Sequence, residues 1–204
     1  MKKFFTFVLL AAFLPLAVFA SADEKAVLFV KELTDNVITN VLESKENQEK
    51  KEADFKKYFT QALDLPSIGR FVLGRYWKSA DKQQRDDFIQ IFMDATAKSW
   101  ADRFNLYTGQ QLEFLGSRFM NNNPNQIYVD SKIMDKKSPV EVIWRLQKKQ
   151  DSYKIIDIII ENVSMALTYR NEYNAFLQSH NGDIAALINQ IRQKGADARE
   201  DKIN

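Results

Sequence analysis

Four runs of strand-forming residues, joined by short polar links, constrain the fold of this 204-residue chain more than any other feature. The runs are Gln111 to Phe119, Gln126 to Ile133, Val140 to Leu146 and Tyr153 to Ile160. Antiparallel strands can be joined by a tight turn, whereas parallel strands need a crossover of about a dozen or more residues. The links, which contain NNNPN, MDKKSP and QKKQDS, are too short for a crossover. The sequence therefore predicts an antiparallel meander.

The fourth run is apolar on both faces, unlike the third, which alternates apolar residues with Glu141 and Arg145. Alternate residues of a strand point to opposite sides. We expect one face to carry Ile156, Ile158 and Ile160 and the other to carry Ile155, Asp157 and Ile159. A strand of this kind needs either a packed layer on each side or an apolar cavity on one side.

Helical periodicity precedes the strand runs. Apolar residues recur at helical spacing from Val27 to Val41, and a second helical stretch surrounds Phe55 and Phe59. The charged run ESKENQEKKEAD lies between them. We interpret this run as a polar connection between two helices.

Two further helices are expected before the first strand. Asp64 predicts the start of a short helix that ends at Gly74, and Ser79 predicts the cap of a long helix over residues 80 to 107, ended by Gly109. The apolar arc of the long helix exceeds half of its circumference on a helical wheel. We therefore expect this helix to contact apolar material on two sides.

The strand runs are followed by two more helices. Ser164 is expected to cap the first and Asp183 the second, and the chain should fray after Gly195. The predicted fold class is α+β, a four-stranded antiparallel curved sheet covered by N-terminal and C-terminal helices. We expect one domain at residues 23–194 and a polar flexible tail at residues 195–204.

Residues 1–22 have the pattern of a secretory signal peptide. Two lysines precede an apolar run from Phe4 to Phe19, and small residues follow at the spacing of a cleavage site after Ala20 or Ala22. Removing this segment lowers the basic residues from 29 to 27, against 27 acidic residues. A neutral mature chain argues against nucleic-acid binding. The sequence has no cysteine, which excludes a lipoprotein anchor and disulfides.

The chain is poor in groups that support catalysis. Its only histidine, His180, lies in the loop SHNGD, and there is no Cys-His pair, metal-ligand cluster or glycine-rich phosphate loop. Asp157 and Glu161 share a strand parity and could perform acid/base chemistry in a pocket. The alternative is that both carboxylates are structural, with Asp157 binding backbone or tyrosine donors and Glu161 near solvent. We favour the structural interpretation.

Basic residues cluster around the short third helix and the loop after it. Arg70, Arg75, Lys78 and Arg85 lie there with Tyr76 and Trp77 between them. The cluster is either a solvated face or a phosphate or partner contact at the rim of a pocket.

The chain is also rich in large apolar residues, with 15 Phe, 3 Trp and 7 Tyr. From the residues alone, this surplus fits a well-packed core or a cavity for an apolar ligand equally well.

Three segments resemble the MlaC or toluene-tolerance family of periplasmic phospholipid-binding proteins. They are FVLGRYWKSADKQQRDDFIQIF, DIIIENVSMALTYRNEY and NGDIAALINQIR, which occur in the order of the family and behind a signal peptide. One departure is Asn162, where the family usually has glycine. Asparagine tolerates the left-handed conformation, so we expect the turn to be kept.

The resemblance implies a non-enzymatic periplasmic shuttle with an apolar cavity that takes phospholipid tails. Its implied partners are an outer-membrane lipoprotein complex and an inner-membrane ABC transporter with an MCE-domain ring. Phospholipid is the expected cargo, with no cofactor and no metal, and we expect a monomer. The alternatives are a small-molecule enzyme on a cone-shaped α+β scaffold, using Asp157 and Glu161, and a periplasmic interaction module that binds no lipid.

Apolar residues of the predicted walls are the candidates for lipid binding. They are Val37, Val41, Phe71, Leu73, Trp77, Phe88, Phe92, Trp100, Phe104, Tyr107, Phe114, Val129, Val142, Trp144, Ile156, Ile158, Ile160, Val163, Met165 and Tyr169. The candidates for the rim or for partner docking are Arg70, Arg75, Lys78 and Arg85.

Overall fold

The computed structural model describes residues 22–101, 106–135 and 138–200, with side chains up to residue 194. The leader expected at residues 1–22 and the candidate Phe104 therefore fall outside the described residues, apart from Ala22. In the described ranges, no helix combines the length and the apolar character needed to cross a membrane.

The predicted meander is confirmed. Its strands are β1 (Gln111–Met120), β2 (Asn123–Met134), β3 (Val140–Lys149) and β4 (Ser152–Ile160), paired antiparallel in chain order. A short fifth strand, β5 (Val163–Ser164), follows β4 and was not foreseen. The turn before it places Glu161 and Asn162 at φ 48° and 64°, so Asn162 adopts the left-handed conformation expected of it.

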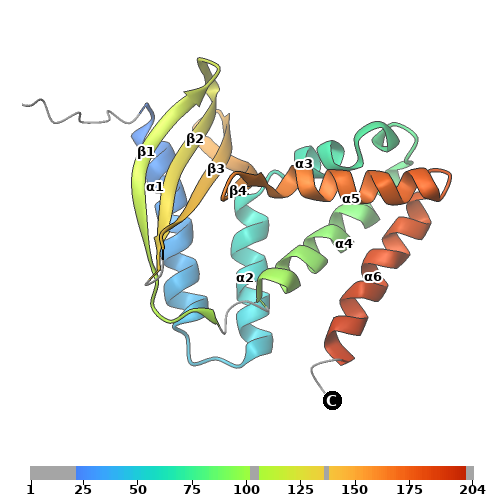
Figure 1. The fold of residues 1–204 in the computed structure, drawn as a ribbon, viewed down its shortest axis with the longest axis horizontal. Coiled ribbons are helices and arrows are strands. Elements are labelled where there is room, and N and C mark those ends of the chain that lie inside the picture. Colours follow the sequence, from blue (N-terminus) through green and yellow to red (C-terminus); the bar gives the residue numbers. More distant parts are fainter. Residues whose placement is uncertain (1–21, 102–105, 136–137, 201–204) are drawn as a thin grey trace, which may run out of the picture.

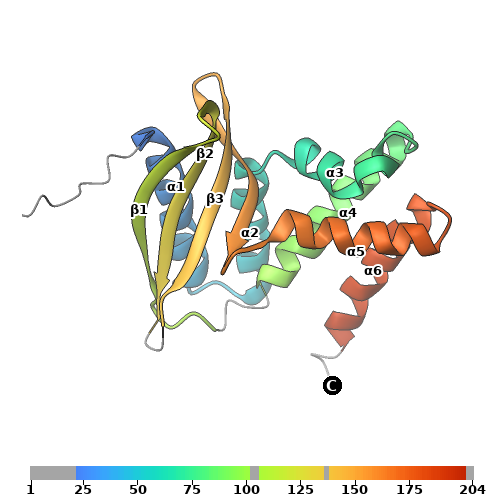
Figure 2. The same ribbon diagram turned by 45° about the horizontal axis from the view of Figure 1, so that its top comes forward.

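The helices form two groups (Figure 1). One group, α1 (Glu24–Val37) with its π-helical extension η1 (Ile38–Leu42) and α2 (Gln48–Ala62), packs beside the curved sheet. The other group contacts β4 through α3 and α5, and the second view shows it beside the sheet (Figure 2). It consists of α3 (Leu65–Leu73), the 3-10 turn η2 (Gly74–Trp77), α4 (Lys82–Ala101), α5 (Met165–Ser179) and α6 (Ile184–Glu200).

Most predicted helix starts are confirmed by their caps. Asp64 accepts a hydrogen bond from the Ser67 amide, and Asp183 accepts one from the Ala186 amide. Ser164 caps α5 in the same way. Side-chain caps act within three residues of the helix start, which makes them visible in sequence.

The predicted cap and end of the long helix were wrong. Its start carries a reciprocal pair in which Asp81 Oδ1 accepts from the Gln84 amide and Gln84 Oε1 accepts from the Asp81 amide. Ser79 was expected to be the cap, but its hydroxyl donates to the Tyr76 carbonyl instead. The helix α4 is described as far as Ala101, and Tyr107, the predicted last residue, is not helical, while residues 102–105 lie outside the described residues. Its two-sided packing is confirmed, because α4 contacts α2, α3 and α6.

Two other helix boundaries were also wrong. The charged run taken as a connection contains the start of α2, because Asn47 caps a helix that begins at Gln48. The last helix continues past Gly195 to Glu200, where we expected the chain to fray. The single-domain division at residues 23–194 stays a prediction.

A β-bulge in β4 overturns the predicted sharing of strand faces. Arg145 of β3 pairs with Asp157 and the next residue, Leu146, pairs with Ile155, so Ile156 is an extra residue on β4. The bulge places Ile155 and Ile158 on the same side, and both are buried. Ile155 therefore shares a face with Ile158 and Ile160 instead of lying opposite them.

Asp23 ties the start of α1 to the sheet. Its carboxylate accepts hydrogen bonds from the Ala26 amide at 3.2 Å and from Tyr153 Oη at 2.8 and 2.9 Å, with Lys148 Nζ 3.5 Å away. Burial raises the pKa of Asp23, but the hydrogen bond from Tyr153 and the other contacts outweigh it and hold the pKa below its ordinary value. Burial, together with Asp23, raises the pKa of Tyr153 to about 12.

We expect Tyr153→Phe to lower the free energy of unfolding by about 1.5 kcal/mol at pH 8, because a hydrogen bond to a charged acceptor is lost. The contribution of Tyr153 is present below pH 10, the ordinary pKa of tyrosine, and falls as the pH rises towards 12. Denaturant titrations of both proteins across this range measure the difference. Tyr58→Phe, on α2, is the control. A difference that stays constant up to pH 12 would contradict the assignment.

Candidate functional site

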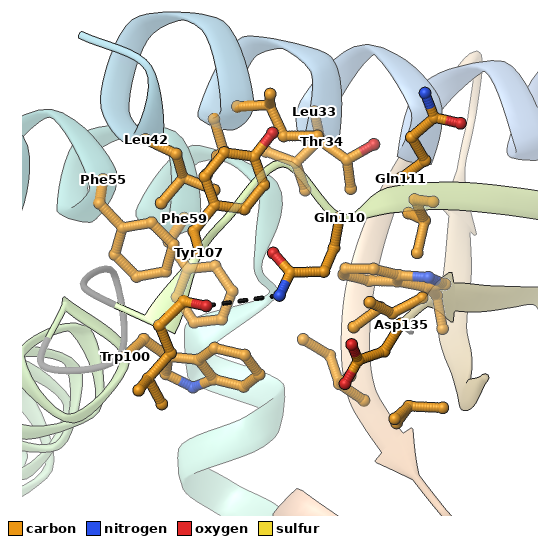
Figure 3. A pocket seen from close by; sticks show the side chains of 18 residues that line it. Leu33, Thr34, Leu42, Phe55, Phe59, Trp100, Tyr107, Gln110, Gln111 and Asp135 are labelled. Carbon is orange, nitrogen blue, oxygen red and sulfur yellow. Dashed lines mark hydrogen bonds between the residues drawn. The ribbon is translucent and has the colours of Figure 1, made fainter. Parts of the chain in front are cut away.

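A cavity of about 370 Å³ lies between the sheet, α1 with η1, α2 and the end of α4 (Figure 3). Most of the surrounding side chains are apolar. Its helical lining consists of Leu33, Thr34, Val37, Ile38, Leu42, Phe55, Phe59 and Trp100. The rest of the lining consists of Leu106, Tyr107, Gln110, Gln111, Leu112, Ile133, Asp135, Val140, Trp144 and Ile158. Cavities of a few hundred Å³ with such walls are typical of ligand sites.

The end of α1 supplies one wall through a change of helical pitch. Glu43 donates its amide hydrogen to the Ile38 carbonyl at 2.9 Å, five residues back, which closes the π-helical turn η1. Ile38 and Leu42 line the cavity, while Val41 is fully buried in the core. Single π-helical turns are frequent at functional sites, and this one sets which apolar residues face the cavity.

The sheet supplies the opposite wall. Trp144 of β3 pairs with Ile158 of β4, and both side chains line the cavity. The indole Nε1 of Trp144 donates to Ser131 Oγ at 3.0 Å, and Ser131 in turn donates to the Val142 carbonyl. Because its polar atom is satisfied inside the sheet, Trp144 can present its ring to an apolar space without a desolvation cost.

The solvent side of the cavity carries polar groups beside one exposed leucine. The exposed members of the lining are the polar residues Gln111 and Asp135 and the apolar Leu106. Beside them Tyr107 Oη donates to Glu43 Oε1 at 3.2 Å, and burial together with Glu43 raises the pKa of this tyrosine. The cavity therefore has an apolar interior and a polar opening, as a ligand with an apolar body and a polar end requires.

Nine of the predicted lipid-binding candidates lie at this cavity or at a smaller neighbouring one of about 40 Å³. Val37, Tyr107 and Trp144 line the large cavity, and Trp100 and Ile158 line both. The small cavity adds Phe92, Ile156, Met165 and Tyr169. Lipid binding by these residues stays a prediction.

The structure places the other described candidates elsewhere. Val41, Leu73, Phe88, Val129 and Val142 are buried core residues, and Trp77, Phe114 and Ile160 pack partly buried against the core. Phe71 and Val163 are exposed, at 39% and 52%. Alternation along a strand identifies its buried face, but cannot tell where a helix covers that face and where a space is left. At Val129 the core is closed, whereas at Trp144 it is open.

Several residues of the cavity wall were not among the predicted candidates. Phe55 and Phe59 stack on each other on α2, with ring centroids 5.0 Å apart, and Leu33 of α1 and Leu112 of β1 complete the wall. Helical periodicity could have identified Leu33 and the two phenylalanines, because they lie in predicted helical stretches. No local signal marks the segment from Leu106 to Gln111, because its role depends on how the chain returns from α4 to the sheet.

The basic cluster is not at the rim of this cavity. Arg70, Arg75, Lys78 and Arg85 lie on α3, on and after η2 and at the start of α4, beyond the helices that flank the sheet (Figure 1). The Arg75 guanidinium stacks on Tyr76 and donates to its hydroxyl at 2.8 Å. Arg85 lies over Trp77 and donates to its carbonyl. These arginines brace the turn between α3 and α4, far from the apolar walls.

Asp157 and Glu161 have structural partners. Asp157 is 5% exposed, and its carboxylate accepts from Ser164 Oγ at 2.6 Å and from the Ala166 amide at 2.9 Å. Glu161 accepts from the Glu141 amide at 2.7 Å. His180 is exposed and stacks on Phe176. Within the described residues no group of three or more His, Asp or Glu side chains could hold a metal ion.

These features define an α+β protein whose curved sheet and helices enclose an apolar cavity of ligand size. The family model described as MlaC protein matches residues 30–193, and the chain belongs to this family. The resemblance drawn from the three sequence segments is therefore confirmed.

Two proteins illustrate the similarity. The chain is 23% identical over 176 residues to the intermembrane phospholipid transport system binding protein MlaC of Haemophilus influenzae, covering 81% of each chain. It shares its fold with a phospholipid-binding protein of Ralstonia solanacearum solved in complex with a phospholipid. The TM-score is 0.75 and the sequence identity is 18%. The match covers 83% of this chain and 96% of that chain. The α+β fold class is thereby confirmed.

Proposed function

We propose that this protein binds the acyl tails of a phospholipid in the 370 Å³ cavity and carries the lipid between two membranes. The observation that carries the proposal is the apolar cavity between α1, α2 and the sheet. Membership of the MlaC family supports it, because the H. influenzae relative is named for intermembrane phospholipid transport.

The proposed location is the periplasm, where the leader at residues 1–22 would direct the chain. The proposed partners are an outer-membrane lipoprotein complex and an inner-membrane ABC transporter with an MCE-domain ring. We propose that the protein is not an enzyme, because Asp157 and Glu161 already hold the turn from β4 into α5.

The energy of tail burial explains why partners are needed. Two acyl chains carry about 30 methylenes, and at about 0.8 kcal/mol each their burial would exceed 20 kcal/mol before ordering costs. That value lies near the practical ceiling of non-covalent affinity. Spontaneous release would be very slow, so transfer requires a partner that opens the cavity or offers a competing apolar path.

Native mass spectrometry tests the proposal on protein purified without detergent. A mass increment equal to one diacyl phospholipid is the expected result. Protein that is free of lipid, and that stays free after incubation with phospholipid vesicles, would contradict it. The same spectra separate the carrier from the two alternatives, an enzyme and an interaction module without lipid.

The basic cluster is proposed to contact a partner instead of the lipid. Arg70 and Lys78 are exposed, whereas Arg75 and Arg85 lie over the rings of Tyr76 and Trp77. We expect Arg70→Glu combined with Lys78→Glu to slow transfer several-fold at low salt and to leave bound lipid in place, because exposed charges mainly tune the rate of encounter. Transfer between vesicles and purified partner membranes measures the effect.

Lys31→Glu combined with Lys25→Glu, on the exposed side of α1, is the matched control. Equal effects of the two double variants would show that the cluster is only a solvated face.

A further inference from the structure

The 370 Å³ cavity is followed by two further spaces that share walls with it. The 40 Å³ cavity lies behind Phe59, Trp100 and Ile158, which line both cavities. A third space of about 300 Å³ lies between α4, α5 and α6, and shares Thr96 and Tyr169 with the small cavity. The three spaces therefore follow one another around the C-terminal half of α4.

The residues shared by the first two spaces all have large apolar side chains. The rings of Phe59 on α2 and Trp100 on α4 have centroids 6.1 Å apart and are tilted by 47°. Ile158 of β4 completes the boundary. Side chains can change rotamer without a rearrangement of the backbone, so this boundary can open while the fold is kept.

The first cavity lies near the lower end of the range of about 300–1,000 Å³ that is typical of ligand pockets. A longer acyl chain needs further apolar space. The small cavity behind Phe59, Trp100 and Ile158 is the space that adjoins it.

The small cavity suits the end of an acyl chain better than it suits water. Most of its lining is apolar. Its polar groups are Thr96, Asp157, the Trp100 indole nitrogen and the Tyr169 hydroxyl, and both oxygens of Asp157 are already bonded to Ser164 and Ala166. A buried water needs two to four polar partners, whereas an acyl chain needs only apolar walls.

We propose that Phe59 and Trp100 form a movable partition that sets the length of acyl chain the protein accepts. This inference rests on the proposed phospholipid-carrier function. The terminal methylenes of a long chain pass between the two rings, enter the small cavity and stop at Tyr169. They stop there because the next space is polar, with Lys98, Glu172 and Lys194 in its lining.

The chain offers a matched pair of variants on one helix. Phe55 and Phe59 are both buried on α2, at 5% and 6%, and their rings stack on each other. Phe55 lines only the large cavity, whereas Phe59 lines both. Phe55→Ala and Phe59→Ala therefore remove the same volume, but only Phe59→Ala opens the partition.

The test loads delipidated protein with an equimolar mixture of dilauroyl and distearoyl phosphatidylcholine and reads the bound ratio by native mass spectrometry. We expect Phe59→Ala to raise the ratio of long to short lipid about tenfold over Phe55→Ala, since even one methylene in an apolar pocket can change affinity by that factor. Trp100→Leu should shift the ratio in the same direction, and serves as the second variant where Phe59→Ala does not fold.

Suppose that Phe59→Ala and Trp100→Leu bind long and short lipid in the same ratio as Phe55→Ala while the wild-type protein binds lipid. That result would contradict the proposed partition and leave the carrier function intact. A wild-type protein that binds neither lipid would overturn the carrier function, and the partition with it.

Discussion

Val37→Trp is expected to expel bound phospholipid and to leave the delipidated protein nearly as stable as the wild type. Val37 is the last residue of α1 and lines the 370 Å³ cavity, so added volume enters an existing space. We expect lipid retention to fall more than tenfold and the Tm of the delipidated protein to change by only a few degrees. Native mass spectrometry and thermal unfolding measure the two effects.

Val129→Trp is the control for this substitution. Val129 is fully buried, pairs with Trp144 across the strands and lines neither the 370 Å³ nor the 40 Å³ cavity. Enlarging a side chain in a closed core costs about 1–3 kcal/mol or more, because the neighbours have no room to move. The comparison uses delipidated protein, since bound ligand raises apparent stability by mass action. If both variants lose the same stability and Val37→Trp keeps its lipid, the cavity does not receive tails.

The second large effect is expected for Asp157→Ala, which should lower the free energy of unfolding by about 3 kcal/mol. The substitution leaves the buried Ala166 amide without its acceptor and removes the carboxylate 3.7 Å from the Arg145 guanidinium. For a domain of this size, that loss corresponds to a fall in Tm of roughly 6–12 °C. Thermal and denaturant unfolding measure it.

Glu161→Ala is the matched control, since its carboxylate lies in the exposed turn after β4 and bonds one exposed amide. We expect a change of less than about 1 kcal/mol. In the fraction that folds, both variants should exchange lipid within a few-fold of the wild type. If a variant keeps its stability but loses lipid exchange by orders of magnitude, the result would support the catalytic interpretation of the two carboxylates.

The sequence could predict what depends on neighbours along the chain. The caps of α3, α5 and α6 are recognisable because Asp64, Ser164 and Asp183 bond amides within three residues. The meander is recognisable because its links are short. The cap of α4 was missed because Ser79 and Asp81 are both good caps, and the choice depended on whether Gln84 could return a hydrogen bond.

The position of the cavity could be predicted only in part. Val37, Trp144 and Ile158 were chosen because they are apolar at helix or strand spacing, and the structure brings them together. The same criterion also chose Val129 and Phe88, which the structure buries in closed core. Spacing shows that a residue faces inward, but it carries no information on whether another element fills the space in front of it.

By itself, the sequence determined the fold class, the order of the strands and the family, because these follow from local periodicity, short links and contiguous motifs. The tertiary structure decided three further things: the π-helical turn after Val37, the bulge at Ile156 and the location of the cavity. The bulge and the cavity depend on residues far apart in the chain, whereas the π-helical turn is closed by a hydrogen bond between residues five apart. Strand register is set by pairing across the sheet, and a cavity exists only where the side chains of α1, α2 and the sheet leave a space unfilled.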